Sequence, residues 1–343
     1  MAVVVGGQLS VAPKTILVTG AAGMLGRKLL ERLARDRVLG ADQIGHVSLV
    51  EIVEPGRPAG ASFGVETLAA DLADAAVARD LVSSRPDVIF HLAAVVSGEA
   101  ESDFEKGYGV NVDGSRLLLE AVRASGFDYR PRVVFSSSIA VFGPPFPDVI
   151  DDDHSTTPQT SYGTQKAITE LLLSDYSRRG FLDGVAIRLP TICVRPGKAN
   201  LAASGFFSSI IREPLNGEDA VLPVPETVRH WFASPRAAVG FLVHAATLES
   251  GALDGWRCLT MPGVSETVGG EIAALRRIAG EEVVRRIRHD SDETLTRMVA
   301  SWRRRFDPQR ALTLGFQAET DFEQIIRVYI ADELGGSIGA AGS

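Results

Sequence analysis

The chain has 343 residues, which corresponds to two domains of ordinary size or to one large, elaborated domain. Hydrophobic residues make up 45% and charged residues 23%, as in soluble globular proteins, so the composition excludes a disordered or fibrous chain. The 43 acidic side chains outnumber the 35 basic ones, and the net charge of −8 argues against nucleic acid or an anionic membrane as a partner.

The cysteine content and the apolar runs indicate the compartment. The chain contains two cysteines, Cys193 and Cys258, so no disulfide framework can be read and a reducing compartment is expected. Residues 1–12 lack the basic start and the long apolar centre of a secretory signal. Because no apolar run is long enough to cross a bilayer, we expect a cytoplasmic protein without a membrane partner.

The first part of the chain alternates between apolar runs typical of buried strands and segments with helical periodicity. The predicted strands are residues 14–19, 47–53, 65–68, 88–92, 132–135 and 185–189. The predicted helices are residues 23–38, 73–83, 110–125 and 161–179. This alternation predicts an α/β fold with a doubly wound, mostly parallel sheet of the Rossmann type.

The alternation is lost after about residue 194, where stretches rich in proline, glycine and polar residues begin. Helices are predicted at residues 206–212, 235–248, 266–279 and 322–334, and a strand at residues 257–261. Residues 335–343 are glycine-rich and are expected to form a flexible tail. We therefore expect a smaller C-terminal portion that closes over a ligand.

A glycine-rich turn lies between the first predicted strand and the first helix. In Gly20-Ala21-Ala22-Gly23-Met24-Leu25-Gly26, the glycines permit a tight turn, close approach of the backbone to a pyrophosphate, and close helix–strand packing. The helix that follows presents free N–H groups to the anion. The alternative is that these glycines serve only the turn.

Acidic residues after the next two strands have the positions of ribose and adenine contacts. Glu51 can accept hydrogen bonds from ribose hydroxyls and would repel a 2′-phosphate, so NAD is favoured over NADP. Asp71-Leu72 can contact the adenine. The alternatives are a solvated carboxylate for Glu51 and a helix cap for Asp71.

Tyr162 and Lys166 lie at positions i and i+4 of a predicted helix and therefore on one face. A tyrosine has an ordinary pKa near 10, which a neighbouring ammonium lowers toward the range useful for a general base. Upstream, Ser136-Ser137-Ser138 follows a predicted strand, at the sheet end that faces a ligand crevice. These serines can instead terminate the strand by bonding to the backbone.

Together with His91-Leu92-Ala93-Ala94 and Asn111, these motifs resemble the extended short-chain dehydrogenase/reductase (NAD-dependent epimerase/dehydratase) family. The resemblance runs from about residue 15 to the last predicted helix. It implies a catalytic triad of Ser138, Tyr162 and Lys166, and Phe142 departs from the tyrosine of many members. The implied NAD contacts are Gly20, Gly23, Met24, Leu25, Gly26, Glu51, Asp71, Leu72, Leu92, Ala93, Ala94, Asn111, Tyr162, Lys166 and Pro190. For Asn111, a polar residue early in a helix is the alternative.

Residues 95–101, 157–184 and 188–200 resemble one group within this family, the D-erythronate dehydrogenases. The implied reaction is NAD-dependent oxidation of the C2 hydroxyl of a small sugar acid, D-erythronate, to the 2-oxo acid. The expected substrate contacts are Ser97, Ser138, Tyr162 and Arg229, with Lys198, Asn200 and Arg212 as weaker candidates for the carboxylate. Residues 13–194 would form the NAD-binding domain and residues 195–334 mainly the substrate-binding portion, with segments able to return to the sheet.

Several alternatives stay open at this point. A nucleotide-sugar 4-epimerase that retains NAD and a uronate dehydrogenase fit the same motifs, and a non-catalytic cofactor sensor would be expected to lack Tyr162 or Lys166. The family often forms homodimers through the helix that carries the tyrosine. No His/Cys spacing suggests a metal, and the arginine pairs near residues 276 and 285 lie among acidic residues, which predicts a mixed-charge surface.

Overall fold

The computed structural model describes residues 3–5, 8–10, 12–197, 203–300, 302 and 304–338. An 8-stranded sheet runs through the molecule in the order β14-β10-β8-β7-β3-β5-β4, with β6 also paired to β5. Its parallel strands are β3 (Lys14–Thr19), β5 (Asp42–Glu51), β6 (Gly64–Ala69), β7 (Val88–His91), β8 (Arg132–Ser138), β10 (Asp183–Leu189) and β14 (Cys258–Thr260). The short β4 (Val38–Leu39) pairs antiparallel to β5. The predicted Rossmann-type fold is confirmed.

The strand order reverses beside β3. From β3 the chain continues outward to β5 and β6, then crosses to β7 on the other side of β3 and continues to β8 and β10. In parallel α/β sheets a ligand crevice forms outside the carboxyl ends of the strands at such a reversal. Here that position lies between the ends of β3 and β7, at Thr19 and His91.

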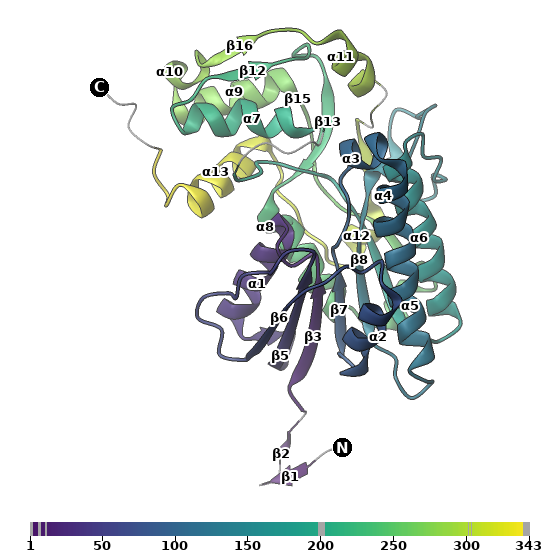
Figure 1. Ribbon diagram of the computed structural model, residues 1–343. Helices are drawn as coiled ribbons and strands as arrows, with labels where there is room; N and C mark the ends of the chain where they lie inside the picture. Colours follow the sequence, from purple (N-terminus) through teal and green to yellow (C-terminus); the bar gives the residue numbers. More distant parts are fainter. Residues whose placement is uncertain are drawn as a thin grey trace.

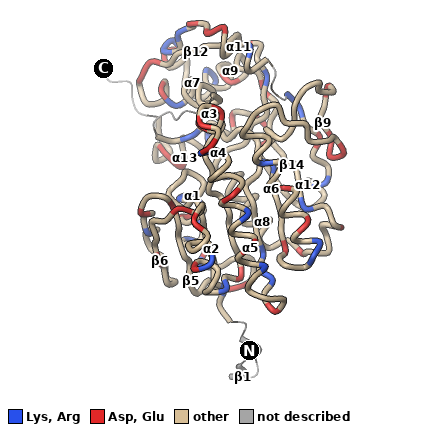
Figure 2. Tube along the Cα trace, turned by 45° about the vertical axis from the view of Figure 1, so that its right-hand side comes forward, with Lys and Arg blue, Asp and Glu red and all other residues tan. Residues whose placement is uncertain are grey.

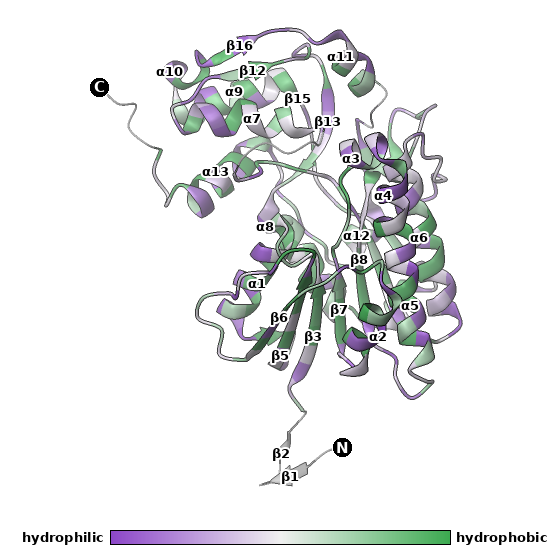
Figure 3. Cartoon of the chain, in the orientation of Figure 1, coloured by the Kyte–Doolittle hydropathy of each residue, from purple (hydrophilic) through white to green (hydrophobic). Residues whose placement is uncertain are grey.

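Helices cover both faces of this sheet (Figure 1). Helices α1 (Met24–Asp36) and α8 (Pro235–Thr247) pack on one face, and α2 (Ala75–Ser83), α5 (Ser115–Ala124) and α6 (Ser161–Arg178) cover the other. The central strands are correspondingly rich in apolar residues (Figure 3), and the successive residues Leu17 and Val18 of β3 are fully buried. Burial on both sides explains the continuous apolar runs of the sequence.

The C-terminal portion lies above the carboxyl ends of the strands in Figure 1. Its helices are α7 (Gly205–Leu215), α9 (Val268–Ala279), α10 (Glu281–Val284), α11 (Glu293–Ala300) and α13 (Phe322–Glu333). Its strands are β11 (Thr191–Ile192), β13 (Arg229–Ala233) and β15 (Val264–Thr267) in one sheet, and β12 (Ala220–Leu222) with β16 (Ile287–His289) in another. These elements enclose a second core that includes Phe207 and Phe232.

Smaller elements complete the fold. They are the pair β1 (Val3–Val5) and β2 (Gln8–Ser10), helices α3 (Ser97–Ser102) and α4 (Phe104–Tyr108), the pair β9 (Ile150–Asp151) and β17 (Phe306–Asp307), helix α12 (Gln309–Thr313), and single-turn segments at Ile139–Val141 and Ser250–Leu253.

Two predicted helices differ from the structure. Residues 110–125 were expected to form one α-helix, but Gly109–Gly114 form a π-helical segment before α5, and the wider turn accompanies the side-chain contacts of Asn111 described below. The helix predicted at residues 266–279 begins only at Val268, because Val264–Thr267 pair with β13. Of the predicted tail, residues 339–343 lie outside the described part of the chain.

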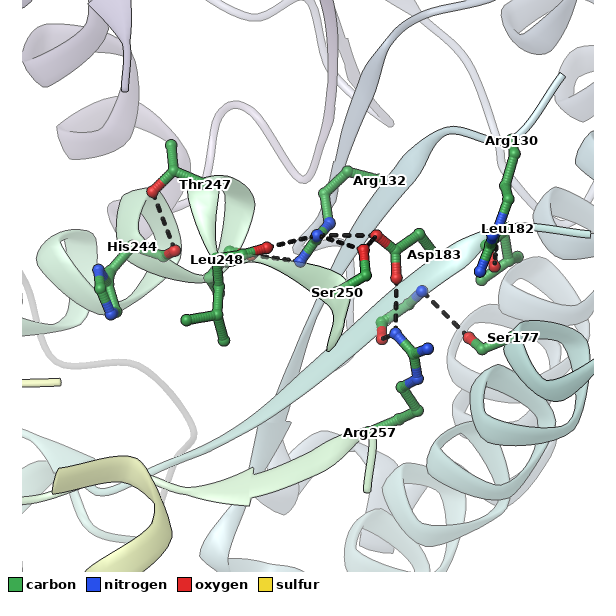
Figure 4. A network of polar contacts seen from close by, with 12 residues as sticks. Arg130, Arg132, Ser177, Leu182, Asp183, His244, Thr247, Leu248, Ser250 and Arg257 are labelled. Atoms are coloured by element: carbon green, nitrogen blue, oxygen red, sulfur yellow. Dashed lines mark hydrogen bonds and ion pairs between the residues drawn. The ribbon is translucent and has the colours of Figure 1, made fainter. Parts of the chain in front are cut away.

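An ion-pair network ties the amino ends of three strands together (Figure 4). Asp183 of β10 bonds Arg132 of β8 at 2.7 Å and Arg257, which precedes β14, at 2.6 Å. Arg132 also donates to the carbonyl oxygens of Ala245 and Leu248 at the end of α8. We call this group the Asp183 network.

The surface carries interspersed charges of both signs (Figure 2). Arg276 pairs with Glu281 and Arg285 with Glu282, which confirms a mixed-charge surface at these arginines. In the described part of the chain, no helix combines the length and apolar composition needed to span a membrane. Nor do three His, Cys, Asp or Glu side chains come together there in a possible metal site.

Candidate active site

A cavity of about 600 Å³ opens at the carboxyl ends of β3, β7, β8 and β10. Many residues predicted as NAD or substrate contacts line it, namely Gly20, Gly23, Met24, Leu25, Gly26, Leu92, Ala94, Ser97, Ser138, Tyr162, Lys166 and Pro190. The cavity is therefore continuous from the glycine turn to the tyrosine and lysine.

The glycine turn has the close backbone approaches that its sequence predicts. Gly20 has a φ of +76°, and a Cβ built on it would lie 2.5 Å from the backbone nitrogen of Ala93. A Cβ on Gly26 would lie 2.3 Å from the carbonyl oxygen of Gly20, so this glycine lets α1 pack against the turn. Helix α1 begins at Met24 without a side-chain cap, which leaves N–H groups for an anion. The turn fits the pyrophosphate of a dinucleotide.

The acidic residues expected near the adenosine lie outside the lining of the cavity. Glu51 ends β5, and its carboxylate accepts a hydrogen bond from the Ile52 amide at 2.9 Å. Asp71 accepts from the Ala73 amide at 2.9 Å, whereas the cap of α2 is Asp74. Leu72 is 7% exposed, and its side chain belongs to the core under α5.

Tyr162 and Lys166 are brought to β8 by the start of α6. Thr160 caps this helix by accepting from the Gly163 amide at 3.1 Å. Gly163 permits the helix to touch the segment after β8, since a Cβ there would lie 2.2 Å from the Ala140 carbonyl oxygen. Lys166 Nζ donates to the Ser136 carbonyl oxygen at 2.8 Å, and Ser138 hydrogen-bonds the Tyr162 hydroxyl. Ser138, Tyr162 and Lys166 therefore meet at one place.

Burial dominates the electrostatics of this group. It lowers the pKa of Lys166 to about 7 and raises the pKa of Tyr162 to about 12. The sequence predicts that the Lys166 ammonium lowers the tyrosine pKa, but the positive charge that acts on Tyr162 in this direction is that of Arg195, with the Ser138 hydrogen bond acting in the same sense. Desolvation outweighs both.

Asn111 and His91 support the site from behind. The Asn111 side chain accepts from the Val95 amide at 2.8 Å and donates to Gln165 Oε1 at 2.7 Å, so it fixes the segment after β7 against α6. His91 bridges Thr19 and Ser115, each at 2.8 Å, and burial lowers its pKa to about 3. His91 is buried at the end of β7, and its ring is neutral.

Two arginines line the far end of the cavity. Arg195 follows β11, and its Nη2 donates to Ser204 Oγ at 2.9 Å. Arg212 of α7 is 7% exposed and donates to the Arg195 carbonyl oxygen at 2.8 Å. The cavity wall also includes Glu101, Thr191, His230, Met298 and Trp302.

Arg229 lies away from this end. Its guanidinium donates to the Ser265 carbonyl oxygen at 3.0 Å, because β13 and β15 pair side by side, and Arg229 is absent from the lining. Lys198 and Asn200 lie outside the described residues. The sequence analysis did not single out Arg195 as a ligand contact. The pattern that could have indicated it is a basic residue just beyond the carboxyl end of the last strand of the nucleotide-binding half, where ligands bind in parallel α/β sheets.

Comparison with known proteins agrees with this geometry. The sequence model of the NAD-dependent epimerase/dehydratase family matches residues 16–245. Two proteins named D-erythronate dehydrogenase are similar over 92% of this chain and 98% of their own length, one from Cupriavidus necator at 47% identity and one from Haemophilus influenzae at 42%.

Solved structures give the same fold with different activities in their names. A structure described as a nucleoside-diphosphate-sugar epimerase from Agrobacterium tumefaciens has 56% identity and a TM-score of 0.94, covering 98% of this chain and 99% of that one. L-Threonine 3-dehydrogenase from Trypanosoma brucei has 25% identity and a TM-score of 0.79, covering 92% and 95%. Given the family match over residues 16–245 and relatives of nearly equal length, this chain belongs to the NAD-dependent epimerase/dehydratase family, whose cofactor is NAD.

Proposed function

We propose that this enzyme oxidises the C2 hydroxyl of a small sugar acid with NAD, and that the substrate is D-erythronate and the product 2-dehydro-D-erythronate. The observation that carries the proposal is a single cavity that is lined by the glycine turn, by Tyr162 and by Arg195. The names of the relatives at 47% and 42% identity support the choice of a four-carbon acid.

In the proposed reaction, the hydrogen on C2 and the hydrogen of the hydroxyl group leave the substrate for different acceptors. The chemistry that bound NAD would supply is acceptance of the C2 hydrogen as a hydride, which would give NADH. Tyr162, as phenolate, takes the hydroxyl proton, and Ser138 donates a hydrogen bond to the same substrate oxygen. Lys166 would hold a ribose hydroxyl of the cofactor, and the positive charge of Arg195 favours the phenolate form of Tyr162. Carbon 2 thereby becomes a ketone.

The substrate carboxylate is assigned to Arg195. A guanidinium binds a carboxylate through two parallel N–H groups, and Arg195 brings this group into the cavity on the side of Tyr162. Arg212 lies behind it and holds its backbone. Arg195 therefore replaces Arg229 as our candidate for this role, while Ser97, which also lines the cavity, is kept as a contact for a hydroxyl.

A 4-epimerase of nucleotide sugars is the second candidate, supported by the name of the structure at 56% identity. A spectrophotometric screen of four- to six-carbon aldonates and uronates with NAD separates the possibilities. Accumulation of NADH with D-erythronate supports the proposal, and NADH with a uronate alone would redirect it. Interconversion of UDP-sugars without NADH accumulation would refute it.

The proposal also covers the roles of the two parts of the chain and the oligomeric state. Residues 13–194 would bind NAD and residues 195–334 mainly the substrate. A homodimer is proposed through α6, where the apolar Leu171 is 72% exposed. Light scattering of the wild-type protein and of Leu171→Glu tests this, because a dimer that needs this face would become a monomer in the variant. The cytoplasmic location stays a prediction.

A further inference from the structure

Glu170 is a buried carboxylate on α6, one helical turn beyond Lys166 and outside the lining of the cavity. It is 3% exposed and accepts a hydrogen bond from Ser137 Oγ at 2.5 Å. It also forms a two-pronged pair with Arg188, with Nε at 3.0 Å from Oε1 and Nη2 at 2.8 Å from Oε2. All these contacts are made inside the protein.

These contacts join the three elements that carry the proposed active site. Glu170 is on α6, Ser137 on β8 and Arg188 on β10, and Ser137 and Arg188 are register partners in the sheet. The next pair in register is Ser138 with Leu189. The carboxylate therefore fixes the sheet one residue before the serine that hydrogen-bonds Tyr162.

The contacts between α6 and β8 are regularly spaced. Three residues of α6 spaced four apart each contact one of three successive serines of β8. Tyr162 bonds Ser138, Lys166 bonds the carbonyl oxygen of Ser136, and Glu170 bonds Ser137. These contacts give the side chains of Ser137 and Ser138 partners on α6, whereas the Ser136 side chain donates to the His91 carbonyl oxygen at 3.3 Å.

We propose that Glu170, paired with Arg188, is a positioning residue for the active site, which locks the carboxyl end of β8 to α6 and favours the ammonium form of Lys166. The proposal rests on the proposed function, because that assigns Lys166 and Tyr162 their roles.

The electrostatic part of the proposal depends on what faces Lys166. Tyr162 lies on the same helix. The ammonium nitrogen of Lys166 lies 4.7 Å from the ring centre of Phe135 on β8. On β7, His91 is neutral because burial lowers its pKa to about 3. Burial likewise lowers the pKa of Lys166 to about 7, and the charge of Glu170 opposes this change. Without Glu170 a larger fraction of Lys166 would be neutral at neutral pH.

A purely structural ion pair is the alternative, and the chain offers a matched control. The Asp183 network joins the same strands, β8 and β10, at their opposite ends, and it too is buried. A loss of general stability would follow from breaking either one. Only the Glu170 pair should affect Lys166.

The first test reads Lys166 directly and needs no substrate. The chain has five lysines, so ¹³C labelling at the lysine ε-carbon gives a simple NMR spectrum, in which Lys166→Met assigns the signal. We expect the titration midpoint of Lys166 to fall in Glu170→Gln, to return toward the wild-type value in Glu170→Asp, and to stay unchanged in Asp183→Asn. An unchanged midpoint in folded Glu170→Gln would overturn the electrostatic role. If that variant does not fold, Glu170→Gln/Arg188→Met avoids an unpaired buried arginine and carries the same expectation.

The second test is kinetic. In Glu170→Gln we expect kcat to fall about tenfold to a hundredfold, because the reacting groups lose their alignment, and the alkaline limb of the pH profile to move to lower pH. The positioning role would be overturned if kcat fell equally in Glu170→Gln and Asp183→Asn and the alkaline limb of the pH profile stayed where it is in the wild type. A wild-type protein that does not oxidise the aldonate would contradict the proposed function alone, and the NMR result would still decide on Glu170.

Discussion

Replacing Gly20 by alanine tests the glycine turn most sharply. Gly20 has a φ of +76°, and the added Cβ would lie 2.5 Å from the Ala93 nitrogen and 2.6 Å from the Leu92 carbonyl carbon. Both are backbone atoms of the segment after β7, so no change of rotamer relieves the overlap. Gly255 is a matched control, because it has a φ of +79° and no atom within 4 Å of its Cβ position.

The expected loss of stability has two parts. Holding alanine in the left-handed region costs about 1–2 kcal/mol at either position. Relieving the overlap at Gly20 requires the backbone to move, at about 1–3 kcal/mol more. Gly20→Ala should therefore lower the free energy of unfolding by about 2–5 kcal/mol, and Gly255→Ala only by about 1–2 kcal/mol.

Urea titrations give the two stabilities, and calorimetric titration with NAD gives the affinity. The Kd for NAD should rise at least about tenfold in Gly20→Ala, because the displaced turn no longer approaches the pyrophosphate, and should be unchanged in Gly255→Ala. Equal losses of stability together with equal NAD affinities would refute the reasoning, since the close approach at Gly20 would then have no energetic consequence.

Four further substitutions test the site. Tyr162→Phe should lower kcat about 10²–10⁴-fold while NAD binding persists, and steady-state rates near those of the wild type would rule out the base. Arg195→Ala should raise KM for the sugar acid about 10–100-fold and Arg229→Ala should not, whereas the reverse result would return the carboxylate to Arg229. Lys166→Met should stabilise the protein at pH 6, by on the order of 3–5 kcal/mol, because burial lowers the lysine pKa to about 7. That gain in stability should shrink between pH 7 and 10.5, because in this range the unfolded chain binds a proton that the folded wild type has lost. A gain that does not depend on pH in urea titrations would contradict the lowered pKa of Lys166.

The sequence predicts those parts of the fold and site that depend on local patterns. The glycine turn and the Tyr162–Lys166 spacing are local, since a strand–turn–helix and one helical turn fix their geometry. The same spacing extends to Glu170 and could have pointed to it, because a third polar residue on a buried helix face needs partners.

Other features depend on contacts between distant segments. Arg195, Met298 and Trp302 come together only because the C-terminal portion folds back over the sheet. The position of Arg229 follows from the pairing of β13 with β15, which no local pattern in residues 264–267 indicates. The π-helical turn at Gly109–Gly114 likewise coincides with the contacts of Asn111 to Val95 and Gln165.

The decisive measurement follows the hydrogen on C2. D-Erythronate carrying deuterium at C2 is incubated with the enzyme and NAD, and the reduced cofactor is analysed by mass spectrometry. The proposed chemistry predicts one deuterium in each NADH formed, one equivalent of the 2-oxo acid, and formation of both products about 10²–10⁴-fold more slowly with Tyr162→Phe. Reduced cofactor without deuterium, or deuterium returned to a sugar without net NADH, would contradict it.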